Sequence, residues 1–199
     1  MTEKRLAWCG ILAPGVLILA SAVFSLLTPN YSHLTNAISE LGAEGAPLAV
    51  GWNIVGFILV GLLIVAFAWG LHVTIRNQAG VSIVPLLVGL SGIGWMGLGI
   101  FPAEAGFQPS IRTTLHFVMV SVNYLPFIAV AFIFAFRLRS DSYWKRWIVF
   151  STAMGLLAIL SFFIPRTVPA GLSQRIGLGA YFVWLFVMSY ALLRKPARS

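Results

Sequence analysis

Nine polar residues in this chain have side chains of the kinds that bind ligands or take part in catalysis. Arginine holds phosphates and carboxylates, carboxylates and amides orient hydroxyls and amines, and imidazole acts as a base or a metal ligand. They lie in the polar connections between long apolar stretches of sequence or within those stretches. The candidate ligand-binding residues are His33, Asn36, Glu40, Asn53, Glu104, Arg112, His116, Asn123 and Arg175.

The first chemistry that fits these residue types is binding. Arg112 and Arg175 would hold a phosphate or carboxylate, because the guanidinium fork matches such anions. Glu40, Glu104 and Asn53 would orient a hydroxyl or amine of the same ligand. We therefore favour a protein that binds a lipid headgroup or a small polar solute, and the sequence leaves the identity of any cofactor open.

The second chemistry is catalysis by an intramembrane lipid hydrolase or transferase. His116 would act as a general base for Ser32 or Ser39, or a metal would be held by three ligands and a water. The residues available for such a metal are His33, Glu40, Glu104 and His116. The chain contains neither His-x-x-x-His nor His-Glu-x-x-His, and Cys9 is its only cysteine. We therefore predict no metal site and favour binding over catalysis.

The third possibility is a structural or assembly role without a ligand. In that case the charges pair with one another, for example Arg112 with Glu40 or Glu104, and the amides bond to backbone carbonyls. The arrangement of the residues separates the three hypotheses. Convergence of the charges on a cavity favours a ligand, whereas paired charges without a cavity favour a structural role.

Composition indicates that a bilayer is the solvent for this chain. Hydrophobic residues make up 59% of its 199 residues and charged residues 9%, and the mean hydropathy is +0.94. Soluble domains carry about 25% charged residues. The pI of about 10.4 resembles that of a nucleic-acid binder, but the basic residues flank apolar runs and form no single patch. We expect membrane lipids and no nucleic acid as partners, and the oligomeric state stays open.

Six apolar stretches are long enough to cross a membrane. A span needs about 20 apolar residues, and because lipid cannot satisfy open backbone groups, each span should be a helix. We predict an all-α integral membrane bundle of six transmembrane helices, forming a single domain over residues 1–199. The predicted spans are 6–27, 48–75, 81–101, 114–138, 147–164 and 172–193.

The basic residues predict the orientation of this bundle. Placing the N-terminus inside leaves Arg112, Arg166 and Arg175 on the outer side. The other ten of the thirteen basic residues then lie inside: Lys4, Arg5, Arg76, Arg137, Arg139, Lys145, Arg146, Arg194, Lys195 and Arg198. Basic residues accumulate on the cytoplasmic side of membrane proteins. We therefore expect a multi-pass protein of the cell membrane with both termini in the cytoplasm.

The first outer connection, residues 28–47, is long and polar. Leu34, Ile38 and Leu41 recur at helical spacing and predict a short amphipathic helix. His33, Asn36 and Glu40 would form a second, polar face of this helix. The polar face either meets water above the lipid surface or covers the mouth of the bundle.

The fourth span carries the strongest indication of a site. Arg112, His116 and Asn123 follow at i, i+4 and i+11, a stripe that runs about 16 Å along one side of a helix. Polar and ionisable residues at such depth usually face the bundle interior or a wet cavity. Asn53 is either part of this site or a hydrogen-bonding contact between helices. With the stripe and Arg175 beneath it, we favour the first connection as a lid over an outer pocket.

Four segments, taken in order, resemble a known family of bacterial and archaeal membrane proteins, the domain of unknown function 998 family. They are YSHLTNAISELGA at 31–43, GIFPAE at 99–104, His116, and GLSQRIG at 171–177. The resemblance covers nearly the whole chain and implies a six-helix integral membrane protein. The acid after Phe-Pro is often Asp in this family, and here it is Glu104. The resemblance implies no particular activity.

Overall fold

A computed structural model describes residues 2–75, 83–137, 139, 141–165 and 167–195. The regular secondary structure of these residues is helical throughout, as predicted. The α-helices are α1 (Thr2–Leu27), α2 (Ala49–Trp52), α3 (Val60–Ile75), α4 (Ile83–Ile100), α5 (Ile111–Arg137), α6 (Ile148–Ser161) and α7 (Ala170–Arg194). A π-helical segment, η2 (Asn53–Leu59), joins α2 to α3, and short 3₁₀ turns form η1 (Ile38–Gly42), η3 (Ala105–Phe107) and η4 (Trp144–Trp147).

Among the described residues, five helices are long and apolar enough to cross a membrane. They are Arg5–Leu27, Ala49–Ile75, Ile83–Ile100, Ile111–Arg137 and Ala170–Arg194. The sixth predicted span, 147–164, corresponds to α6, which has 14 residues and covers only about 21 Å. It is shorter than predicted because the chain turns at Phe162 and Phe163 and then reaches Pro165. Proline disfavours a helical conformation in the residue before it.

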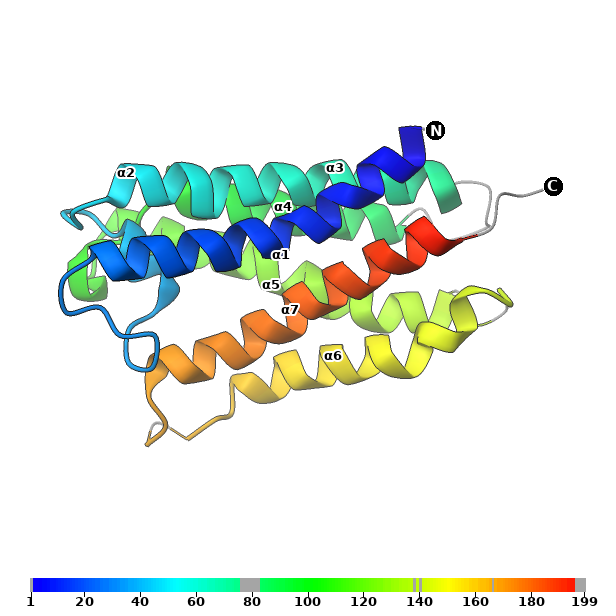
Figure 1. Ribbon diagram of the computed structural model, residues 1–199. Helices are drawn as coiled ribbons and strands as arrows, with labels where there is room; N and C mark the ends of the chain where they lie inside the picture. Colours follow the sequence, from blue (N-terminus) through cyan, green and yellow to red (C-terminus); the bar gives the residue numbers. More distant parts are fainter. Residues whose placement is uncertain (1, 76–82, 138, 140, 166, 196–199) are drawn as a thin grey trace.

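The long helices pack into a closed ring in chain order. Contacts join α1 to α3, α3 to α4, α4 to α5, α5 to α6 and α6 to α7, and α7 closes the ring against α1 (Figure 1). Close approach depends on small residues where lipid provides no hydrophobic drive. A Cβ atom on Gly92 of α4 would lie 2.9 Å from the carbonyl oxygen of Gly61 in α3. The glycines of α4 therefore serve close helix packing.

Aromatic side chains fill the axis of the ring. Trp95 of α4 contacts the rings of Phe57, Tyr181 and Phe182, with centroids 5.0–6.3 Å apart. Phe127 of α5 contacts Tyr181 from the other side at 4.7 Å. Such aromatic pairs contribute about 0.5–1.5 kcal/mol beyond the burial of their area. These contacts connect α4, α5 and α7 across the interior.

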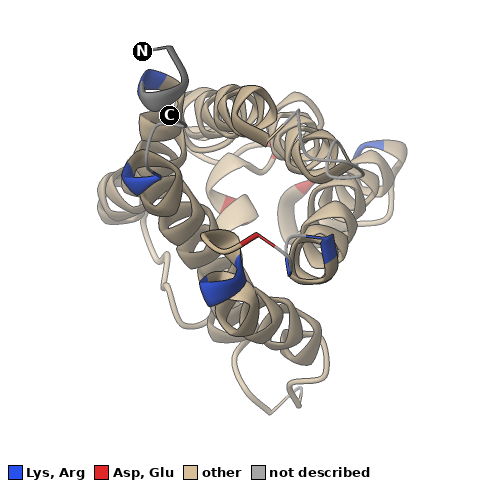
Figure 2. Ribbon diagram, turned by 90° about the vertical axis from the view of Figure 1, so that its right-hand side faces the viewer, with Lys and Arg blue, Asp and Glu red and all other residues tan. Residues whose placement is uncertain are grey.

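Both chain termini lie at one end of the bundle, which we call the terminal end (Figure 1). The opposite, distal end carries the connections 28–48, 101–110 and 162–169. Figure 2 looks onto the terminal end, where blue basic segments lie around the rim. Described basic residues there are Arg5, Arg137, Arg139, Lys145, Arg146, Arg194 and Lys195. The side of the membrane that this end faces stays a prediction.

A few of the sequence predictions fall outside the described residues. They concern the basic residues Arg76, Arg166 and Arg198, the side chain of Lys4, and the span ends at 81–82 and 138. Helix α5 begins three residues before the predicted span 114–138, so it contains Arg112 in its first turn. The predicted stripe is therefore helical along its whole length.

Candidate functional site

The first distal connection contains much less helix than its spacing indicated. Only η1, five residues long, is helical, and Ala37 before it is extended at φ −67° and ψ 149°. His33, Asn36 and Glu40 therefore do not share one face of a helix. The Asn36 side chain accepts a hydrogen bond from the Ser32 backbone N–H at 2.9 Å. Such local side-chain bonds compete with helix formation.

Arg175, in α7, bonds to this connection through neutral groups. Its Nη1 donates to the carbonyl oxygens of Asn36 and Gly171, both at 2.9 Å. Its Nη2 donates to the Tyr31 hydroxyl at 2.8 Å and contacts Nδ1 of His33 at 3.0 Å. The guanidinium thus fastens the 31–36 segment onto α7.

Glu40 shapes the same segment from its other end. Its carboxylate accepts from the Asn36 side-chain amide at 2.7 Å and from the Ala37 backbone N–H at 2.6 Å. The second bond satisfies an open donor at the start of η1, as in a capping box. Gln174 of α7 accepts from the Ile38 backbone N–H at 2.7 Å. Within the described part of the chain Glu40 forms no ion pair. Its carboxylate therefore stabilises the conformation of the connection through these hydrogen bonds.

The start of α7 fits tightly beneath this connection. The Leu172 backbone N–H donates to the Leu34 carbonyl at 2.9 Å. A Cβ atom on Gly171 would lie 2.6–2.8 Å from the carbonyl oxygens of Asn36, Leu34 and His33. Real Cβ atoms do not approach backbone oxygens so closely, so glycine is required at this position. The motifs 31–43 and 171–177 therefore pack against each other.

Arg112 and Glu104 lie apart from this contact. Arg112 forms an ion pair with Glu44 at 2.9 Å, and more than half of each side chain is exposed. The pairing of Arg112 with Glu40 or Glu104, given as an example of a structural role, is wrong. Arg112 pairs instead with Glu44, which follows η1 in the sequence. The Glu44 backbone N–H bonds to the Ala103 carbonyl at 2.9 Å, which holds the two connections together. The Glu104 backbone N–H donates to the Thr113 hydroxyl at 3.2 Å.

Asn53, predicted either as a site residue or as a hydrogen-bonding contact between helices, bonds to the first connection. Its side-chain amide donates to the Gly42 carbonyl at 3.0 Å and holds η1 against the start of η2. Its Oδ1 is buried and has no hydrogen-bond partner among the described residues. Asn53 is absent from the lining of the cavity described next.

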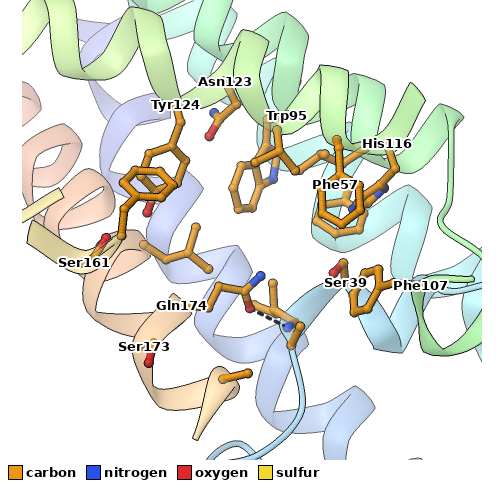
Figure 3. A pocket seen from close by; sticks show the side chains of 18 residues that line it. Ser39, Phe57, Trp95, Phe107, His116, Asn123, Tyr124, Ser161, Ser173 and Gln174 are labelled. Carbon is orange, nitrogen blue, oxygen red and sulfur yellow. Dashed lines mark hydrogen bonds between the residues drawn. The ribbon is translucent and has the colours of Figure 1, made fainter. Parts of the chain in front are cut away.

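A cavity of about 330 Å³ lies beneath the distal connections (Figure 3). Among the residues that the structure describes, no Asp, Glu, Lys or Arg lines it. Of the predicted binding residues, His116 and Asn123 line it. The other polar residues of the lining are Ser39, Trp95, Tyr124, Ser161, Ser173 and Gln174. The structure therefore has a cavity, but the predicted charged residues do not line it. This outcome matches neither alternative completely, since one expected charges around a cavity and the other expected paired charges without a cavity.

His116 enters the cavity wall from α5. The residue is 2% exposed, and its Nδ1 lies 2.9 Å from the Phe101 carbonyl oxygen. Because a carbonyl only accepts, Nδ1 carries the proton of the neutral ring and Nε2 is its acceptor. Figure 3 shows Ser39 and His116 on the same side of the cavity. No hydrogen bond joins them among the described residues, and Ser32 lies outside the lining.

Asn123 belongs to a buried polar cluster deeper in the bundle. Its amide donates to the Ser91 carbonyl at 3.0 Å and contacts the Ser91 hydroxyl at 3.3 Å. The hydroxyls of Ser91 and Tyr181 are hydrogen bonded to each other. All three residues are at most 2% exposed. The cluster joins α4, α5 and α7 at the cavity floor and leaves Asn123 fixed in orientation.

The cavity also contains residues that the sequence did not single out. Tyr124 and Ser161 are two of them, and the Ser161 hydroxyl donates to the Ala158 carbonyl at 2.7 Å. The Trp95 indole N–H donates to the Gly56 carbonyl at 2.9 Å, within the π-helical segment η2. Insertions of π-helix are often found at functional sites. The π-helical segment η2 was not predictable from the sequence. Asn53 and Gly56, which the segment contains, are the only signal of its position.

The residues named for a possible metal do not come together. His33 and Glu40 belong to the first connection, Glu104 to the second, and His116 to the cavity. Among the residues that the structure describes, no three His, Cys, Asp or Glu side chains gather closely enough to hold a metal ion. Any reaction at the cavity would therefore rest on His116 and the hydroxyls near it.

Electrostatics at the distal surface follow from Arg175. Partial burial, and secondly the charge of Arg175, lower the pKa of His33 from its ordinary value. Burial raises the pKa of the Tyr31 phenol, although Arg175 opposes this. Both rings are therefore neutral near pH 7. They provide acceptors for the guanidinium without neutralising its charge.

A ring of apolar antiparallel helices with a cavity near one end defines a multi-pass helical membrane protein. A family model described as "Protein of unknown function (DUF998)" matches residues 11–191. The chain therefore belongs to this family, as the four motifs indicated. No curated protein and no solved structure matches the chain.

Proposed function

We propose that this protein binds a membrane lipid, whose uncharged polar part occupies the distal cavity. The observation that carries the proposal is the lining, whose described residues offer hydrogen-bonding groups but no Asp, Glu, Lys or Arg. Placing an ion in such a site without a counter-charge costs several kcal/mol. A hydroxyl, ester or amide avoids this cost and still uses the polar groups.

Size and access support a lipid. A cavity of about 330 Å³ accepts a headgroup fragment or a small polar solute, since one water takes roughly 30 Å³ of liquid volume. Phe117 and Phe162 line the cavity and are themselves exposed on the bundle surface. The rest of a lipid can therefore stay in the bilayer. A ligand hydroxyl would donate to Nε2 of His116, the acceptor of that ring.

The orientation is part of this proposal. The terminal end would face the cytoplasm of a cell membrane, since cytoplasmic loops are rich in Lys and Arg. Cys9 is the only cysteine, so a Cys9→Ala background allows single labels. Membrane-impermeant maleimide on intact cells should label Thr35→Cys and leave Ser142→Cys unlabelled. The reverse labelling pattern would show that the terminal end faces the outside of the cell.

Lipid binding is tested by filling the cavity. Val120 lines it, whereas Val118 on the same helix is exposed outside it. Native mass spectrometry of the purified protein should detect a bound lipid. Val120→Phe should carry one lipid fewer than the wild type, and the matched Val118→Phe should carry as many as the wild type. Equal retention in both variants, or no lipid in the wild type, contradicts binding in this cavity and favours a role without a ligand.

A second candidate function is hydrolysis or acyl transfer by Ser39 with His116 as base. The observation that favours it is the Phe101 bond, which leaves Nε2 of His116 as the acceptor in a cavity that Ser39 also lines. A fluorophosphonate probe should then label the wild type and Ser173→Ala but not Ser39→Ala. An unlabelled wild type would remove this candidate and leave lipid binding untouched.

A further inference from the structure

A second concavity lies between α1 and α7, on the outside of the ring. Its volume is about 570 Å³. Ile18 of α1 and Val183 and Phe186 of α7 line it and are strongly exposed. These side chains face the surroundings of the bundle, so the groove opens to the bilayer. It shares only Ile38 and Leu178 with the lining of the distal cavity.

The polar groups of this groove lie at its distal end. Arg175 and His33 line it there, and the rest of the lining is apolar except for Ser21. The four contacts of the Arg175 guanidinium are to two carbonyls, a hydroxyl and an imidazole. Within the described residues Arg175 has no carboxylate at ion-pair distance. A half-buried cation that is not in direct contact with a carboxylate can still bind an anion.

We propose that the α1–α7 groove binds an anionic phospholipid of the bilayer, with its phosphate at Arg175 and one acyl chain along the two helices. The guanidinium has an Nε–H donor that none of its four contacts uses, and His33 offers Nε2–H when Nδ1 accepts from Arg175. Both donors suit a phosphate oxygen. Charge complementarity therefore selects an anionic headgroup over a zwitterionic one.

The length of the groove matches one lipid leaflet. Phe186 follows Arg175 by eleven residues, which is about 16 Å along α7. Half of a hydrocarbon core of roughly 30 Å is about 15 Å. A headgroup held at Arg175 thus lets its acyl chain run past Leu178, Phe182 and Phe186 to the middle of the membrane. This depth agrees with a phospholipid and exceeds what a free phosphate needs.

Two glycines provide a matched test of the groove. A Cβ atom on Gly179 meets nothing within 4 Å, and this residue lines the groove. A Cβ atom on Gly15 also meets nothing within 4 Å, and this residue is exposed on α1 outside the groove. Leucine at either position adds the same volume to its helix, and its Cβ atom meets nothing within 4 Å. Only Gly179→Leu occupies the space of the acyl chain.

The experiment is a titration of the full-length protein in detergent with phosphatidylglycerol or phosphatidylcholine, read by native mass spectrometry. The wild type and Gly15→Leu should bind phosphatidylglycerol more tightly than phosphatidylcholine. Gly179→Leu should bind phosphatidylglycerol on the order of tenfold more weakly than the wild type does. Arg175→Gln should abolish the preference for the anionic lipid. Unchanged binding by Gly179→Leu, or a preference that survives Arg175→Gln, overturns the proposal. Val120→Phe should bind phosphatidylglycerol normally, so this result is independent of the distal cavity.

Discussion

At the first distal connection, Glu40 of the connection and Arg175 of α7 bond to backbone groups and neutral side chains, and they hold the connection in a shape that is mostly not helical. In the cavity below, His116 and Asn123 are almost fully buried, and the described part of the lining contains no charged residue. The charged residues thus build the cover, and the neutral ones line the space beneath it. Residue types that suggest chemistry by themselves here serve mainly to position the chain.

The largest effect is expected where the cover meets α7. Gly171→Ala places a Cβ atom against three backbone oxygens and should cost about 1–3 kcal/mol, as overpacked sites do. Thermal unfolding in detergent measures the loss. Gly179→Ala is the control, because its Cβ has free space and alanine favours helix. Equal stability of the two variants would contradict the tight contact between cover and helix.

A smaller effect is expected in the polar cluster at the cavity floor. Asn123→Leu removes the bonds to Ser91 and should cost about 1 kcal/mol, in the range measured for hydrogen bonds inside membrane proteins. The same variant should also weaken retention of the cavity lipid in native mass spectrometry. Ser121→Ala, on the exposed side of α5, should change neither quantity. A loss of stability with unchanged lipid would restrict Asn123 to a structural role.

The ion pair of Arg112 and Glu44 should contribute little. Both side chains are more than half exposed, and such pairs are worth about 1 kcal/mol or less. A double-mutant cycle with Arg112→Gln and Glu44→Gln should give a coupling in that range, which decreases with added salt. Lipid retention should stay at the wild-type level. Loss of the lipid in Arg112→Gln would show that Arg112 contributes to lipid binding.

The smallest effect is expected from His33. Its folded-state pKa lies below the unfolded value, so its contribution is fully present above the unfolded pKa of about 6.5. The contribution is lost as pH falls through the folded pKa, because a protonated ring cannot accept from Arg175. Stability between pH 8 and 5 should fall slightly more for the wild type than for His33→Gln. Identical profiles would show that this contact does not contribute to stability.

Helical periodicity placed the cavity residues better than the surface ones. His116 and Asn123 lie inside the ring, where α5 has neighbours on both sides. Arg112 shares their side of the helix but lies in the first turn, beyond the packed part of the ring, and is exposed. Periodicity gives the direction of a side chain about the helix axis. It does not show whether another helix reaches the same height.

The first connection was less predictable for a related reason. Its apolar spacing indicated a longer helix, but Asn36, Glu40 and Arg175 satisfy its backbone in another way. Arg175 is 139 residues from Asn36 in sequence. A hydrogen bond over that separation depends on α7 lying beside α1. The local sequence of the first connection therefore cannot predict it.

The sequence by itself determined that the chain is a bundle of apolar helices, because a bilayer accepts only segments whose backbone bonds are internal. It also determined the family and the two cavity residues on α5. Tertiary structure decided which polar groups meet. It brought Arg175 to the first connection rather than to Arg112, and it left Ser39, Tyr124 and Gln174 around a neutral cavity. Those contacts depend on α7 closing the ring against α1, which is a contact between segments far apart in sequence.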